Sequence, residues 1–282
     1  MRSERKPREL KKADLHIHTS FSDGTFSPQE VIAQAKKHRI DCVAICDHDC
    51  VDALELATDF AEKEGVELIP GIELTAEKDD NEVHILGYYI DWKNKILLKA
   101  IEEMQKIRIE RIYDMIEKLK KVNVYIKPEE VFQISGKGSV GRLHLAYAIY
   151  NSGYTKYVKE AFKLYIGDGK SCYVNKFNFS PNEVIDIVLK SGGIPVLAHP
   201  GVMGRDEFIS EYAEGGLRGI EVYHSDHSPK ASEHYLEIAK KMNLLVTGGS
   251  DCHGLGKQNV LMGTVTIDYS LVEELKKAAG RL

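Results

Sequence analysis

The stretch Asp14-Leu15-His16-Ile17-His18-Thr19-Ser20-Phe21-Ser22-Asp23-Gly24 decides the architecture of this chain. Apolar and polar residues alternate over its first half, which is typical of a half-buried strand. His16 and His18 are two residues apart, so on a strand both imidazoles point to the same face. Asp23 follows after a short polar turn, from which its carboxylate can return toward that face. The stretch therefore predicts part of a metal site, although a packed pair of core histidines explains the same pattern.

Strands and helices alternate after this first strand. The spacing of apolar residues predicts buried strands over 42–46 and 66–72 and helices over 28–38 and 52–64. Ser27, Pro28 and Glu30 form a capping box at the start of the first helix, and Gly65 ends the second helix. This alternation is typical of a parallel α/β sheet. A fourth strand over 83–89 carries His84 near its beginning.

The alternation breaks over residues 92–178. Apolar residues three or four apart predict a long helix over 93–122, and further helices follow near 143–151 and 156–165. Strands over 194–198, 219–223 and 244–247, separated by helices, then resume the first pattern, and a helix over 271–279 closes the chain. We therefore predict an α/β barrel made of residues 1–91 and 179–282, interrupted by an all-α insertion over 92–178 that caps the substrate.

Ligand-type side chains recur where the predicted strands end. In a parallel barrel all carboxyl ends of the strands meet on one face, where such enzymes keep their active sites. Imidazole and carboxylate groups without a thiolate signature suit Zn, Mn or Fe. The pattern therefore predicts a site for two or three divalent ions. The residues at or just after strand ends are His16, His18, Asp47, His48, Glu73, His199, His224, Asp251 and His253.

Composition limits the function further. The chain has 282 residues, 43% of them hydrophobic and 29% charged, and a net charge of −5, as expected for a soluble globular protein without a general affinity for nucleic acid. Five cysteines without a paired C-x-x-C motif predict a reduced, cytoplasmic protein. The basic segment 1–12 lacks an apolar stretch and is interpreted as a solvated tail. No segment approaches the roughly 18 apolar residues that span a membrane.

The predicted metal site favours chemistry at phosphorus. Two or three divalent ions roughly 3.5–4 Å apart suit in-line displacement at a phosphate and make hydroxide available near neutral pH. A serine or cysteine nucleophile is then unnecessary, and the sequence contains no G-x-S-x-G motif. The segment Gly167-Asp168-Gly169-Lys170 lacks the spacing of a phosphate-binding Walker loop.

As an ordered set, these motifs resemble the PHP (polymerase and histidinol phosphatase) family of metal-dependent phosphoesterases. The segments that carry the resemblance are His16-Ile17-His18, Ser22-Asp23-Gly24, Asp47-His48-Asp49, Pro70-Gly71-Ile72-Glu73, His84-Ile85-Leu86-Gly87-Tyr88, Ala198-His199-Pro200 and Ser250-Asp251-Cys252-His253. The resemblance implies a distorted seven-stranded (βα) barrel with a trinuclear site. It assigns one ion to His16, His18, Glu73 and Asp251, a second to Asp23, His48 and His253, and a third to Glu73, His84 and His199.

The helical insertion resembles that of the PHP subgroup acting on nucleoside 3′,5′-bisphosphates and short RNA 5′ ends. Gly141-Arg142-Leu143-His144 is similar to a Gly-Arg-Pro-His segment that meets substrate phosphate in that subgroup, with Leu143 in place of proline. Arg142 and His144 are therefore predicted to bind substrate, although a surface pair at a helix start explains them too. Arg205 is a further phosphate-binding candidate or a solvated charge. His224 is predicted to be catalytic, as an orienting group, a phosphate donor or a general acid.

Several functions remain open at this point. The favoured one is hydrolysis of a phosphomonoester in a small nucleotide, and the main alternative is 5′→3′ exonucleolytic cleavage of short RNA. A histidinol-phosphate-type phosphatase and a metal-stabilised regulatory module without turnover are weaker alternatives. The sequence leaves the identity of the metals and the oligomeric state undecided.

Overall fold

A computed structural model describes residues 11–281 of the chain, except residues 80, 176–177 and 257–259. The strands in chain order are β1 Lys12–Ile17, β2 Cys42–Ile45, β3 Glu67–Lys78, β4 Asn81–Tyr88, β5 Ile194–Leu197, β6 Gly219–His224, β7 Leu245–Gly249 and β8 Ile267–Asp268. They form a single sheet in the order β7-β6-β5-β4-β3-β2-β1-β8. The predicted tail over residues 1–12 lies almost wholly outside the described residues.

The sheet curls into a barrel because the segment after β7 returns to β1. The backbone N–H of His18 donates to the carbonyl of Cys252 at 3.0 Å, and the N–H of Cys252 donates to the carbonyl of His16 at 3.4 Å. The short strand β8, which the sequence did not predict, adds to β1 in antiparallel orientation. The predicted α/β barrel is confirmed, with this extra strand beside the seam.

Among the barrel strands β1 to β7, one strand runs against the others. β1 to β3 are parallel, and so are β5 to β7, whereas β4 is antiparallel to both of its neighbours. The prediction that the third strand ends before Glu73 is wrong, because β3 continues to Lys78 and pairs with β4, with Thr75 opposite His84. The reversal explains why His84 lies near the start of its strand and still reaches the barrel end that carries the other ligands.

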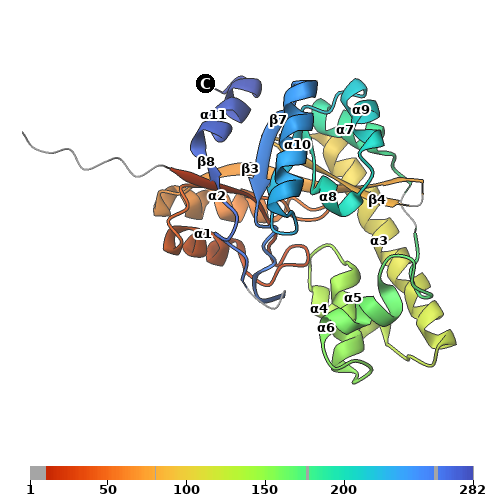
Figure 1. Ribbon diagram of the computed structural model, residues 1–282. Coiled ribbons are helices and arrows are strands. Elements are labelled where there is room, and N and C mark those ends of the chain that lie inside the picture. The colour runs from red at the N-terminus through yellow and green to blue at the C-terminus, as the bar shows by residue number, and fades with distance from the viewer. Residues whose placement is uncertain (1–10, 80, 176–177, 257–259, 282) are drawn as a thin grey trace, which may run out of the picture.

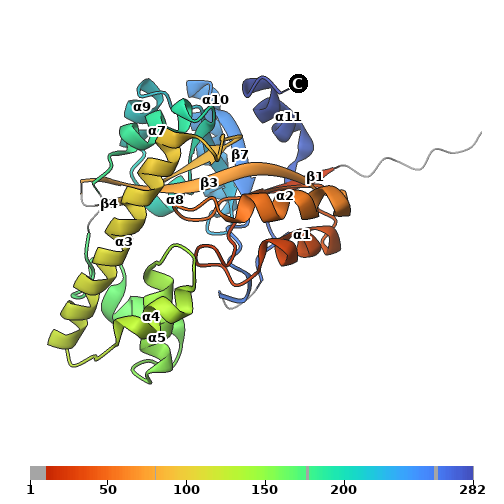
Figure 2. The same cartoon turned by 180° about the vertical axis from the view of Figure 1, so that it is seen from behind.

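Helices cover the outside of the barrel. Figures 1 and 2 show α1 and α2 together on one side and α7, α9 and α10 on the other. The predicted capping box of α1 and the left-handed Gly65 after α2 are confirmed. The helices are α1 Pro28–Lys37, α2 Ala53–Glu64, α3 Lys95–Lys121, α4 Pro128–Ser135, α5 Arg142–Asn151, α6 Val158–Ala161 with a π-helix Phe162–Ile166, α7 Pro181–Lys190, α8 Pro200–Met203, α9 Glu207–Glu214, α10 Pro229–Met242, a 3₁₀ turn Gly254–Gly256 and α11 Tyr269–Ala278.

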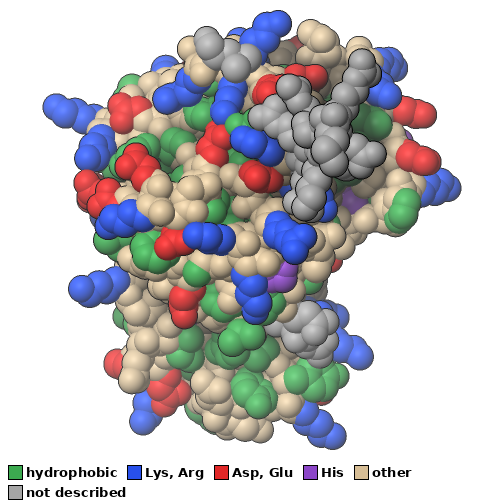
Figure 3. Space-filling model, turned by 90° about the vertical axis from the view of Figure 1, so that its left-hand side faces the viewer, with side chains coloured by type: hydrophobic (Ala, Val, Ile, Leu, Met, Phe, Trp, Pro, Cys, Tyr) green, Lys and Arg blue, Asp and Glu red, His purple; other side chains and the backbone are tan. Residues whose placement is uncertain are grey.

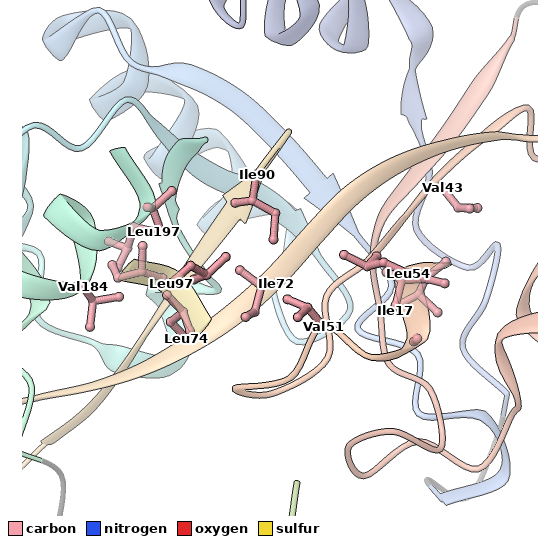
Figure 4. Close-up of a cluster of buried hydrophobic side chains, with 14 of the residues drawn as sticks. Ile17, Val43, Val51, Leu54, Ile72, Leu74, Ile90, Leu97, Val184 and Leu197 are labelled. Atoms are coloured by element: carbon pink, nitrogen blue, oxygen red, sulfur yellow. The ribbon is translucent and has the colours of Figure 1, made fainter. Parts of the chain in front are cut away.

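The barrel has an outer and an inner apolar layer. In the outer layer helices pack on strands, and Figure 4 shows Ile72 of β3 between Leu97 of α3 and the Val51–Leu54 segment. In the inner layer Tyr88 of β4 donates a hydrogen bond to the carbonyl of Leu15 on β1 at 2.9 Å. Two strands separate β4 from β1 in the sheet, so this contact crosses the inside of the barrel.

The segment between β4 and β5 builds a lobe with its own apolar cluster. Figure 1 shows α4, α5 and α6 below the barrel, with α3 running from the barrel into the lobe. α4 is a helix that the sequence did not predict. The boundaries of the insertion at 92 and 178 stay a prediction. The lobe cluster contains Ile112, Met115, Ile116, Leu119, Val131, Leu145, Ile149, Ala161 and Ile166.

The lobe contacts the barrel at the turn that follows β1. The backbone N–H of Ser139 donates to the carbonyl of Phe21 at 2.9 Å. A Cβ on Gly138 would lie 2.6 Å from the backbone of Phe21, so only glycine allows this approach. The lobe is thereby fixed against the turn that carries Asp23.

The five cysteines are free and buried, so Cys42, Cys46 and Cys50 pack as small apolar residues. Within the described ranges, no helix is both long and apolar enough to cross a membrane.

Candidate metal centre and substrate cavity

Glu73 in the middle of β3 is the centre of a dense cluster of histidines. Its Oε2 lies 3.3 Å from the Nε2 atoms of both His16 and His18 and 3.1 Å from Nδ1 of His48. Its Oε1 lies 2.9 Å from Nδ1 of His84 and 3.0 Å from Nε2 of His199. One buried carboxylate is thus positioned to serve more than one ion.

Electrostatics keep this carboxylate charged. Burial raises the pKa of Glu73, but the imidazoles of His48, His84 and His16 outweigh burial and hold the pKa well below its usual range. A buried glutamate that stays ionised among imidazoles has the charge that a divalent cation needs.

Asp23 organises a second group on the opposite side of His18. Its Oδ1 lies 3.2 Å from Nε2 of His253, and its Oδ2 lies 4.0 Å from Nε2 of His48. The ligand atoms of Asp23, His18, His48 and His253 all lie within 4.8 Å of one another. Asp251 lies on the Glu73 side of His18, with its Oδ1 3.1 Å from Nε2 of His18 and 3.6 Å from Nε2 of His16.

The structure brings all of the predicted ligand side chains together. They come from β1, β3, β4 and the segments that follow β1, β2, β5 and β7, which meet at one end of the barrel. We call this set the metal cluster: His16, His18, Asp23, His48, Glu73, His84, His199, Asp251 and His253.

The ring nitrogens of three histidines show which atoms are available to a metal. Nδ1 of His16 donates to Glu221 at 3.0 Å, Nδ1 of His253 donates to the carbonyl of Asp251 at 2.9 Å, and Nε2 of His84 donates to Glu82 at 3.0 Å. In the neutral ring, which is the form that binds a metal, the opposite nitrogen carries a lone pair that faces the cluster. Metal-binding histidines use this arrangement.

Several buried polar atoms of the cluster lie close to a neighbouring polar atom but do not have the geometry of a hydrogen bond with it. They include Oδ1 of Asp23, Oε2 of Glu73 and Nδ1 of His48. Buried polar groups are rarely left unsatisfied unless they serve an ion or a ligand. Together with the imidazole and carboxylate donors, these atoms fit divalent metal ions.

His224 at the end of β6 adjoins the cluster in a different role. Its Nε2 lies 3.6 Å from Oδ2 of Asp251, and its Nδ1 accepts a hydrogen bond from the backbone N–H of Asp226 at 3.1 Å. A ring that accepts at Nδ1 carries its proton on Nε2. His224 therefore presents an N–H donor, not a metal-binding lone pair, toward the site.

Two buried carboxylates hold ligand residues in position, and the sequence analysis did not predict this role for either of them. Glu221 of β6 accepts from the ring of His16 and, at 2.9 Å, from the backbone N–H of His199. Asp14 accepts from the backbone and the hydroxyl of Ser250 at 2.8 and 2.6 Å, and burial raises its pKa to about 6. The sequence did contain a signal for Glu221, because a charged residue inside an otherwise apolar strand indicates a buried polar contact.

The turn that carries Asp23 is fixed by Asp47. This buried carboxylate accepts hydrogen bonds from the backbone and hydroxyl of Thr19 at 2.7 and 2.6 Å and from the hydroxyl of Ser22 at 2.5 Å. Asp47, which follows a strand end as predicted, thus supports the site from behind.

Arg142 lies beside the cluster, at the start of α5. Its guanidinium pairs with Glu82 at 3.4 Å and with Asp168 at 2.5 Å, and it stacks over the ring of Tyr173. Glu82 also accepts from His84, so one carboxylate joins Arg142 to the cluster. Arg142 lines a cavity of about 240 Å³ that His84 and His199 share.

The other two predicted substrate residues are His144 and Arg205. His144 is buried at the start of α5, where its Nδ1 accepts from the backbone N–H of Gly141 at 2.9 Å, and a hydrogen bond to the backbone of Ser22 brings it next to the turn that carries Asp23. Arg205 is exposed and lies 3.2 Å from Glu207. Among the described residues neither side chain lines the two cavities at the cluster.

A larger cavity of about 750 Å³ opens between the barrel and the lobe. The metal cluster forms its barrel side, through residues that include Asp23, Glu73 and His253. Side chains of α5, α6 and the π-helix form its lobe side. The volume is in the range typical of small-molecule sites.

Comparison with known proteins places these features in a family. The family model described as the PHP domain matches residues 14–175. The chain is 29% identical to the 5′-3′ exoribonuclease Rnm of Escherichia coli over 247 residues, which are 85% of this chain and 84% of that protein. It is also 29% identical to the 3′,5′-nucleoside bisphosphate phosphatase of Chromobacterium violaceum over 250 residues, with 86% and 88% of the two chains covered.

The fold is similar to that of a solved structure as well. A protein from Bifidobacterium adolescentis described as a metal-dependent phosphoesterase superposes with a TM-score of 0.88 at 33% identity. The similarity covers 96% of this chain and 97% of the other.

Proposed function

The chain belongs to the PHP-domain family of metal-dependent phosphoesterases, and on this premise we propose that it removes a phosphate from a small nucleotide such as a nucleoside 3′,5′-bisphosphate. The observation that carries the proposal is the cavity of about 750 Å³, which joins the metal cluster to an apolar wall. A phosphate at the cluster and a nucleoside against the wall fill both parts of this cavity.

We propose that the cluster holds two or three divalent ions through the residue sets that the family resemblance implies. Glu73 would belong to two of these sets, which His16, His18 and Asp251 would complete in one case and His84 and His199 in the other. Asp23, His48 and His253 would hold the remaining ion. When bound, ions of this kind lower the pKa of water and offset the charge of the phosphate.

The protein groups around the ions position the phosphate. His224 donates a hydrogen bond from Nε2 to a phosphate oxygen, because its Nδ1 is occupied by the N–H of Asp226. A neutral imidazole in this state is a poor proton donor. Among the three predicted roles of His224 we therefore favour donation of a hydrogen bond to the phosphate over general-acid catalysis or orientation of another group. Arg142 binds a second phosphate through its planar fork once the exposed Asp168 side chain moves aside.

A second candidate function is exonucleolytic cleavage of short RNA, because one relative is named as an exoribonuclease. Cleavage of short RNA from its 5′ end requires the same chemistry at the metal cluster, and the two relatives are equally similar to this chain. The volume of the cavity, about 750 Å³, is that of a small-molecule site and favours the small nucleotide. The complete ligand set weighs against a regulatory module without turnover, and the lobe weighs against a histidinol-phosphate-type phosphatase.

The direct test compares three substrates in the presence of Mn²⁺. We expect inorganic phosphate release from adenosine 3′,5′-bisphosphate and little cleavage of a 5′-phosphorylated RNA oligomer. Mononucleotides appearing from the oligomer at the higher rate would replace the proposed function with RNA cleavage. Hydrolysis of para-nitrophenyl phosphate alone would contradict both nucleotide functions and leave the phosphoesterase.

The role of Arg142 has a separate test. Arg142→Ala should raise KM for adenosine 3′,5′-bisphosphate by about 10- to 100-fold, since a charge-assisted pair contributes about 1.5–3 kcal/mol. KM for para-nitrophenyl phosphate, which has no second phosphate, should hardly change. Arg218→Ala, at an exposed position, is the matched control. Equal changes for both substrates would remove Arg142 from this role.

A further inference from the structure

Helix α5 is apolar on both of its faces. One face packs into the lobe cluster through Leu145, Ala148 and Ile149. Leu143, Tyr147 and Tyr150 lie four and three residues apart and therefore share another face, which lines the large cavity. A helix that is apolar all round usually has a partner on each side. On the face of α5 formed by Leu143, Tyr147 and Tyr150, the cavity takes the place of a packing partner.

The neighbouring segment extends this surface. Tyr157 and Val158 at the start of α6 and Phe162 at the start of the π-helix also line the cavity. Single π-helical turns are rare and frequently mark functional sites. We call Leu143, Tyr147, Tyr150, Tyr157, Val158 and Phe162 the aromatic wall.

Solvent reaches the aromatic wall. Tyr150 is 41% exposed and Tyr157 is 51% exposed. Figure 3 shows hydrophobic side chains gathered over the lower part of the molecule, where the lobe lies. Exposed apolar surface of this kind often marks a binding site.

The two sides of the cavity differ sharply in chemistry. The barrel side consists of imidazoles and carboxylates, whereas the aromatic wall contributes rings and aliphatic side chains, with Lys159 as a charged neighbour. A matching ligand carries phosphate at one end and a flat apolar group at the other. Aromatic side chains stack on any of the four bases, because each base has a π-face.

Resting on the proposed function, we propose that the aromatic wall binds the nucleobase of the substrate by stacking and does so with little preference among bases. The wall then distinguishes nucleotides from other phosphate esters. Stacking on aromatic side chains makes binding roughly 10- to 100-fold tighter, in keeping with about 1–3 kcal/mol per base.

The test uses a substrate that lacks the base. Wild-type kcat/KM should be about 10- to 100-fold higher for adenosine 3′,5′-bisphosphate than for ribose 3,5-bisphosphate. The kcat/KM values for the 3′,5′-bisphosphates of the four nucleosides should lie within about tenfold of one another. The double variant Tyr150→Ala, Tyr157→Ala should lose this advantage while keeping the rate on the base-free substrate. Tyr125→Ala, which removes a lobe tyrosine that is 61% exposed and outside the cavity lining, should keep the advantage.

Binding provides a readout that does not depend on turnover. Calorimetric titration should show tighter binding of adenosine 5′-monophosphate than of ribose 5-phosphate to the wild type, and equal binding to the double variant. Equal binding of the two probes to the wild type would overturn the inference, even if nucleotides are hydrolysed. If nucleotides are not hydrolysed but still bind more tightly than ribose 5-phosphate, the proposed function fails and the base site stands.

Discussion

Glu221 shows how a residue outside the metal cluster can control it. The carboxylate is fully buried, and its two oxygens accept from the ring of His16 and from the backbone of His199. The histidines near it outweigh the effect of burial and keep its pKa below the usual value. Glu221 therefore fixes the orientation of one ligand and the backbone position of another.

The substitution Glu221→Gln should weaken metal binding by about 10- to 100-fold, the typical effect of losing a partner behind a metal ligand. The amide keeps the shape of the side chain but lacks the charge that favours the His16 tautomer. Competition with a fluorescent chelator measures the affinity. Glu233→Gln, on the exposed side of α10, is the matched control and should bind metal like the wild type. Unchanged affinity in Glu221→Gln would show that His16 needs no such partner.

Individual site residues could be predicted from the sequence where ligand-type side chains recur at the same place in successive strands. His16, His48 and His253 all lie at or just after strand ends, and that shared place made them predictable. The role of Glu221 could not be predicted, because its partner His16 is 205 residues away and only the closed barrel brings them together. The tautomer of His224 depends on a backbone N–H and was equally beyond the sequence.

Helix α3 connects the lobe to the metal cluster through a buried ion pair. Arg108 donates from Nε to Asp49 at 2.5 Å and from a terminal nitrogen to the hydroxyl of Thr75 at 2.6 Å. Gln105, one turn earlier, donates to the carbonyl of Asp49 at 2.9 Å. Asp49 follows His48 directly, so this helix holds the segment that presents a predicted ligand.

Removing both partners of this pair should cost less stability than the two single removals added together. In metal-free protein, Arg108→Met should lower the free energy of unfolding by about 3–5 kcal/mol, since it leaves a buried carboxylate unpaired. Asp49→Asn combined with Arg108→Met should cost less than the sum of the two single changes, and urea unfolding measures each term. Lys106→Met, at an exposed pair on the same helix, should change stability by less than about 1 kcal/mol. Strict additivity would mean that Arg108 and Asp49 do not interact.

The elements themselves were predictable to different degrees. Helix α1 was located accurately because Ser27, Pro28 and Glu30 satisfy its first backbone N–H groups. The β3–β4 hairpin was not, since a buried run such as Leu74 to Ala76 looks the same in a parallel and an antiparallel strand. Arg108 interrupted an apolar stripe in the sequence, and only the structure gives the reason.

The molecule as a whole combines a barrel that supplies chemistry with a lobe that supplies contacts to the substrate. Figure 1 shows both parts, joined by α3. The order of strands and ligands predicted the barrel, because every ligand had a defined place in a repeating pattern. The cavity between the two parts was not predictable, since it depends on how the lobe docks on the turn after β1.

The central claim is that divalent ions at the metal cluster give the protein its phosphoesterase activity. We would remove the metals with a chelator, add Mn²⁺ back in measured amounts per chain, and follow hydrolysis of para-nitrophenyl phosphate. We expect no activity without metal, a rise to a plateau at two to three ions per chain, and at least a 1,000-fold lower plateau (about 4 kcal/mol of transition-state stabilisation) in Asp23→Asn. Full activity in the metal-free protein, or a wild-type plateau in Asp23→Asn, would contradict it.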